Sequence, residues 1–168
     1  MNNLINANVE AVDQALQVIT SITDANYRDR VGGRSQPGAH IRHILDHYRA
    51  LQTGFAEGEV DYDARRRQCA AETDRACAEK ELIETKAWLQ SLSADPVAVK
   101  VKSEVSLCES CTVTVDSDSS RELLYVLNHT VHHMAYLALL LQINDVQVGE
   151  NVGLAPATAS HLRAVAAR

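Results

Sequence analysis

Aromatic residues are scarce in this sequence, which has one tryptophan, one phenylalanine and five tyrosines among 168 residues. A core that depends on leucine, isoleucine, valine and alanine favours packed helices over an aromatic-rich β-sandwich. At this length, one domain with a substantial core is the expected organisation.

An excess of basic residues is also missing, because 16 lysines and arginines are outweighed by 22 aspartates and glutamates, for a net charge of −6. This balance argues against a nucleic-acid partner, which requires a basic face. No uncharged apolar stretch reaches the ~18 residues of a membrane span, and the N-terminus lacks the basic start of a signal peptide. We therefore expect a cytoplasmic protein that acts on a small molecule, with its four cysteines as thiols.

Apolar residues recur at helical spacing in four separate stretches, each long enough for several turns. They predict amphipathic helices over residues 3–24, 37–56, 68–92 and 120–143.

Between the third and fourth stretches the pattern changes to a period of two. Valines alternate with lysine and glutamate over residues 97–107, and a second alternating run covers 112–115. This period is typical of half-buried strands, so a hairpin with its turn at Cys108 to Cys111 is predicted. The fold expected is one domain over residues 1–168, an all-α, up-down four-helix bundle with a small β-hairpin insertion. We expect a homodimer formed through an exposed helical face.

Cap and turn residues mark the helix ends. Ser35 followed by Pro37 predicts the start of the second helix. The run Ser119 to Glu122 has the capping-box pattern that begins the fourth. Irregular connections are predicted at 26–38 and 59–67, and a short last helix at 156–161.

Six of the seven histidines lie in two segments, A-H-I-R-H-I-L-D-H-Y at 39–48 and N-H-T-V-H-H-M-A-Y-L at 128–137. His129 and His133, four residues apart, share the apolar half of their helix at a separation of about 6 Å. A buried imidazole needs a partner, so this pair indicates two metal ligands. The alternative is that each is a core histidine hydrogen-bonded to a backbone or carboxylate group.

The first histidine segment offers His40, His43 and His47 as a third ligand. On a helical wheel His40 and His47 lie nearer the apolar arc, while Arg42 and Asp46 point toward water. Three neutral imidazoles with an open fourth position are typical of a catalytic metal site, and zinc, nickel or iron(II) accepts such ligands.

The two segments together, S-Q-P-G-A-H-I-R-H-I-L-D-H-Y and H-T-V-H-H-M-A-Y-L, resemble the DinB family (DinB/YfiT-like metalloenzymes). The resemblance implies a four-helix bundle in which one histidine of the second helix and a His-x-x-x-His pair of the fourth bind a metal ion. The pair corresponds to His129 and His133. Matching Ser35 to the family's serine or threonine at the helix start places the single ligand at His43. His47 is then an alternate ligand or a neighbour that supports the ligands.

Some members of this family join a low-molecular-weight thiol, such as bacillithiol or mycothiol, to an electrophile. The resemblance therefore implies a mononuclear metal-dependent enzyme, a thiol S-transferase with a divalent metal ion and a thiol cosubstrate. Ala135 stands where ergothioneine-pathway domains of the family have glutamate, so their mechanism is not implied. The competing interpretation is a non-catalytic metal-binding or structural dimeric bundle with a stress-related role.

Two further motifs have simpler interpretations. Cys108 and Cys111 form a single C-x-x-C, and without a second one they predict a turn with two thiols. The runs 61–63 and 65–67 predict a solvated loop with local salt bridges, the alternative being a basic mouth that binds an anionic substrate.

Overall fold

Four long helices make up most of the structure: α1 (Asn2–Ser21), α3 (Pro37–Glu57), α5 (Arg75–Ser91) and α6 (Ser119–Ile143). This computed structural model describes residues 1–30 and 35–167. Within that part of the chain there are also three short helices, α2 (Asp24–Arg28), α4 (Ala70–Thr73) and α7 (Pro156–Ala166). None of the described helices is long and apolar enough to cross a membrane. The expectation of a mainly helical protein is confirmed.

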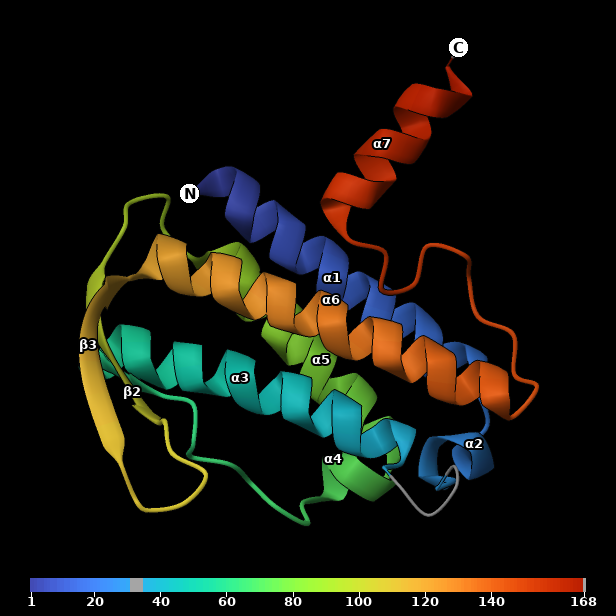
Figure 1. The fold of residues 1–168 in the computed structure, drawn as a ribbon, viewed down its shortest axis with the longest axis horizontal. Helices are drawn as coiled ribbons and strands as arrows, with labels where there is room; N and C mark the ends of the chain where they lie inside the picture. Colours follow the sequence, from blue (N-terminus) through green and yellow to red (C-terminus); the bar gives the residue numbers. More distant parts are fainter. Residues whose placement is uncertain (31–34, 168) are drawn as a thin grey trace.

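The long helices pack around a shared apolar core (Figure 1). α1 contacts both α5 and α6, and α3 also contacts both. The apolar arc predicted for α3 is buried except at its last member, Phe55, which is partly buried. The other members each have 1% or less of their surface exposed: Ile41, Ile44, Leu45, Tyr48 and Leu51.

A three-stranded sheet lies at one end of these helices (Figure 1). It consists of β1 (Glu59–Asp61), β2 (Ala98–Glu104) and β3 (Thr112–Asp118), in that order. β2 and β3 form the predicted antiparallel hairpin, and β2 buries Val99 and Val101. β1 was predicted as part of a connection, because only the buried Val60 gives its three residues any apolar character.

The strand pairing fixes the helix directions. β1 follows α3, β2 follows α5, and the two strands pair in parallel. The C-terminal ends of α3 and α5 therefore lie at the same end of the molecule, so these two helices run in the same direction. The predicted up-down alternation is wrong at this pair, because residues 62–74, including α4, return the chain to the far end before α5 begins (Figure 1).

Two of the predicted segments are divided differently. The third predicted helix is split at Asp74, whose carboxylate accepts hydrogen bonds from the backbone N–H groups of Ala76 and Cys77 and so caps α5. The irregular segment predicted at 26–38 begins within the short helix α2, and its residues 31–34 lie outside the described part of the chain.

The helix starts differ from the predicted caps. Gln36, not Ser35, precedes α3, although Pro37 does occupy its first turn. Asp118 caps α6 by accepting from the N–H groups of Ser120 and Arg121, so the predicted capping box is wrong. Its glutamate is instead fully buried, as described below. The short last helix is confirmed as α7, which buries none of its residues.

Candidate metal centre

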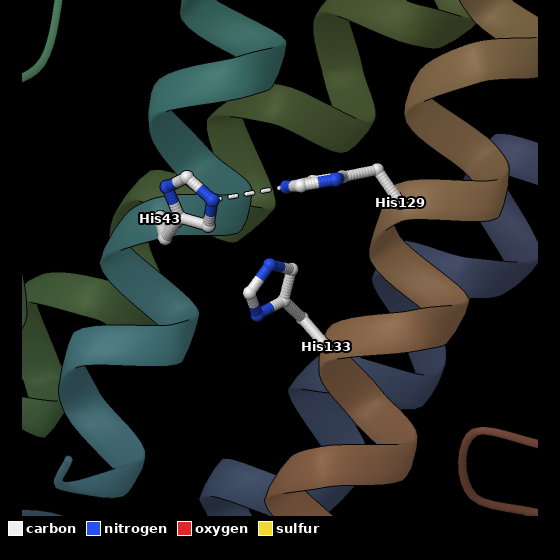
Figure 2. Close-up of side chains that lie close together, drawn as sticks. All are labelled: His43, His129 and His133. Carbon is white, nitrogen blue, oxygen red and sulfur yellow. Dashed lines mark hydrogen bonds between the residues drawn. The ribbon is translucent and has the colours of Figure 1, made fainter. Parts of the chain in front are cut away.

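His43 of α3 and His129 and His133 of α6 face one another across the contact between these helices (Figure 2). One ring nitrogen from each lies within 4.8 Å of the others. The Nε2 atoms of His43 and His129 are 3.0 Å apart. The structure thus brings together the three residues that the sequence and the family resemblance singled out.

A buried polar network sets the register between the helices that carry these histidines. The Tyr48 hydroxyl donates to Asn8 Oδ1 over 2.9 Å, and the Thr130 hydroxyl donates to Tyr48 over 3.4 Å. Asn8 Nδ2 donates to the backbone oxygen of Leu123 over 3.1 Å. All three side chains are buried, so they join α1, α3 and α6 where leaving any of their groups unpaired would be costly.

His40 and His47, which the helical wheel favoured, flank His43 and contact the α6 pair. His47 donates from Nδ1 to the His43 backbone oxygen over 3.0 Å. Its ring stacks on His129 with centroids 3.9 Å apart and planes inclined by 20°. His40 Nδ1 lies 3.0 Å from His133 Nδ1. Neither residue belongs to the group of three. The helical wheel therefore favoured two histidines that lie beside the candidate metal site and not in it.

Burial keeps these imidazoles neutral. Burial, followed by the charges of the neighbouring histidines, lowers the pKa of His43 from 6.5 to about 2. The pKa of His129 is lowered to about 4, mainly by burial and then by the charge of His47. The pKa of His133 is lowered to about 3, mainly by burial and then by the charge of His129. At neutral pH each ring therefore has a free lone pair, the form in which histidine binds a metal ion.

We expect the metal-free protein to lose thermal stability as the pH falls from about 6.5 to about 5, after a level region above pH 7. Histidines in the unfolded chain take up protons near pH 6.5, whereas His43, His129 and His133 in the folded chain do not until about pH 4 or below. The unfolded state therefore binds more protons in this window, and the free energy of unfolding falls.

Thermal melts in chelator-treated buffers would measure this effect. A variant with both His43→Leu and His133→Leu should show a shallower fall, because fewer depressed imidazoles remain. A melting temperature of the wild-type protein that stays level down to pH 5 would contradict the expectation.

The three-histidine group fits a divalent metal ion. Two metal–nitrogen bonds of tetrahedral zinc place their nitrogens roughly 3.3 Å apart. The 3.0 Å between His43 Nε2 and His129 Nε2 is close to that spacing. Neutral nitrogen donors also suit nickel and iron(II). With three protein donors, one coordination position stays available to water or substrate.

The buried carboxylates near this region are held by other groups. Asp46, predicted to face water, is 4% exposed and accepts from Arg42 over 2.6 Å and from Arg66 over 2.9 Å. The prediction is wrong because Arg66 comes from the loop after β1, which the wheel did not include. No carboxylate of the described residues joins the three-histidine group.

Tyr62 and Glu122 form a polar contact beside the histidines. This contact was not predicted from the sequence. The Tyr62 ring stacks on His47 with centroids 5.2 Å apart, and its hydroxyl donates to Glu122 over 2.6 Å. Ser117 also donates to this carboxylate over 2.5 Å. The one sequence signal was a tyrosine between two aspartates in a segment that was predicted to be a solvated loop.

The basic run has divided roles. Arg66 pairs with Asp46 and with Glu81, over 2.9 Å in each case, which fits the predicted local salt bridges. Arg65 is exposed, and its positive charge lies close enough to lower the pKa of His43, after burial and the three neighbouring histidines. Asp63 from the same loop acts in the opposite direction on the pKa of His47, so charges of both signs lie near the histidines.

The remaining histidines and the cysteines do not belong to the group of three, although the His132 ring lies edge-on to His133 with centroids 5.4 Å apart. His132 is exposed on α6, and His161 is exposed on α7. Cys108 and Cys111 are free thiols in the hairpin turn, as predicted. Cys69 and Cys77 are free and partly buried.

Comparisons with known proteins give one distant similarity. The chain is 28% identical over 107 residues to FK506-binding protein 5 of Rhizopus delemar. That match covers 62% of this chain, and the chain spans 28% of the length of that protein. No family model matches the sequence, and no solved structure matches it.

Proposed function

We propose that this protein is a mononuclear metal-dependent enzyme that transfers a low-molecular-weight thiol to an electrophile. The observation that carries the proposal is the convergence of His43, His129 and His133, whose ligand atoms all lie within 4.8 Å of one another. The resemblance of both histidine segments to the DinB family supplies the reaction class. Under this proposal α1, α3, α5 and α6 form the family's four-helix bundle, in a soluble cytoplasmic homodimer.

The chain's own residues divide the work as follows. The three imidazoles would hold a divalent ion, whose positive charge would lower the pKa of a thiol bound next to it. His47 covers one face of His129 and excludes water there. Arg65 attracts the anionic substituents of a small thiol. The thiol sulfur forms a bond to an electrophilic carbon, the leaving group departs with its bonding electron pair, and the thiol proton passes to solvent.

A screen of thiols against a chromogenic electrophile tests this function. We expect the metal-loaded protein to accelerate conjugation with at least one thiol such as bacillithiol or mycothiol. The His43→Ala variant and the chelator-treated protein should both lose that rate. His132→Ala should keep it, because this exposed side chain lies outside the group of three.

The second candidate is a non-catalytic metal-binding bundle, and the lack of a free carboxylate among the two buried near the histidines favours it. Asp46 and Glu122, which are buried near the centre, are occupied by hydrogen bonds from arginines and hydroxyl groups, so neither is free to act as a general base. Stoichiometric metal without turnover of any thiol would select this candidate.

A further inference from the structure

His40 lies one turn before His43 on α3 and has one polar partner among the described residues. Its Nδ1 is 3.0 Å from His133 Nδ1. Its Nε2 is buried and has no hydrogen-bond partner in the described part of the chain. The ring of Tyr136 packs against it with centroids 4.8 Å apart. The polar interactions of His40 are therefore directed at His133.

The tautomers of the two rings are linked through this contact. A neutral imidazole has one N–H group and one nitrogen lone pair. In Figure 2, one ring nitrogen of His133 points toward His43 and His129, while the other points away. Because Nδ1 of His133 faces His40, its Nε2 is the atom available to the group of three. A ring that uses the Nε2 lone pair for a metal ion carries its hydrogen on Nδ1.

The hydrogen on His133 Nδ1 then needs an acceptor 3.0 Å away, and His40 Nδ1 is the atom at that distance. His40 can accept only with its own hydrogen on Nε2. In this tautomer the Nε2–H of His40 is buried and has no acceptor among the described residues, so the contact with His133 is the one hydrogen bond that the His40 ring makes there. His47 is placed differently, because its ring stacks on His129 and its Nδ1–H is donated to the His43 backbone oxygen.

We propose that His40 is a positioning residue, which accepts a hydrogen bond from His133 Nδ1–H and so holds the Nε2 lone pair of His133 toward His43 and His129. The inference rests on the proposed metal site. Groups that orient a metal-bound histidine in this way change metal affinity by about 10- to 100-fold when they are removed.

Two variants of nearly equal shape isolate the hydrogen bond. His40→Asn places a side-chain oxygen near the position of the histidine Nδ1, whereas His40→Leu fills similar space and cannot accept. Zinc affinity, measured by competition with a chromophoric chelator, should fall about 10- to 100-fold in His40→Leu. It should stay within about threefold of wild type in His40→Asn, and the cobalt(II) absorption spectrum should be altered only in His40→Leu.

The outcomes separate the inference from the function it rests on. Wild-type zinc affinity in His40→Leu, or equal losses in the two variants, would overturn the positioning role and leave the metal site intact. A wild-type protein that binds no zinc would overturn both. Melts of the metal-free variants show whether they fold. If His40→Leu does not, His40→Gln replaces it, because its acceptor lies near the Nε2 position.

Discussion

Replacing His129 by alanine is expected to abolish stoichiometric metal binding. Its Nε2 is 3.0 Å from His43 Nε2, at the centre of the three-histidine group. Removing a direct ligand should cost more than the roughly 10- to 100-fold loss seen when only an orienting partner is removed. Protein purified without a histidine tag should contain about one ion per chain as wild type, and almost none as His129→Ala, by elemental analysis.

Thermal stability gives a second measurement of the same change. A ligand at about 100 times its dissociation constant stabilises the folded state by roughly 2.7 kcal/mol. For a protein of this size that raises the melting temperature by roughly 5–10 °C. Wild type should show this rise with added zinc, and His129→Ala should not.

His132→Ala is the matched control, because His132 lies on the same helix and is exposed. It should retain both the metal and the zinc-dependent rise. Full metal occupancy in His129→Ala, or its loss in His132→Ala, would be incompatible with the proposed ligand set.

Gly38→Ala is expected to destabilise the protein by about 3 kcal/mol, which lowers the melting temperature by roughly 6–12 °C. A Cβ atom at this position would lie 2.1 Å from the backbone oxygen of Glu72 and 2.6 Å from the Tyr27 ring. The Glu72 contact is with backbone, so the first turn of α3 or the α4 segment must move. Gly38 therefore permits the close approach that places His40 and His43.

Gly149→Ala provides the comparison for this substitution. A Cβ there meets only Val152, at an ordinary contact distance of 3.8 Å. Its stability should change by no more than about 0.5 kcal/mol. Chemical denaturation of both metal-free variants would measure the difference. Equal free energies of unfolding would show that α3 and α4 can move apart without loss of stability.

Local patterns in the sequence predicted the hairpin and the long helices, except that α4 and α5 were predicted as one helix. The predicted second and fourth helices, 37–56 and 120–143, agree with α3 and α6 to within one residue at each end. The short strand β1 and the helix α2 were missed, because elements of three and five residues carry too little periodicity. β1 exists through its pairing with β2, about 40 residues away in the chain.

The sequence alone determined that His129 and His133 share one face of a helix, because a spacing of four residues fixes that relation. It did not determine which histidine of α3 faces them. The wheel measures the angle around one helix, and that angle favoured His40 and His47. Which turn of α3 meets the pair depends on the position of α3 along α6. The hydrogen bond of Thr130 to Tyr48, and the link from Tyr48 through Asn8 to Leu123, fix that position. The resemblance of the histidine segments had singled out His43, and the packed structure places it in the group with His40 and His47 beside it.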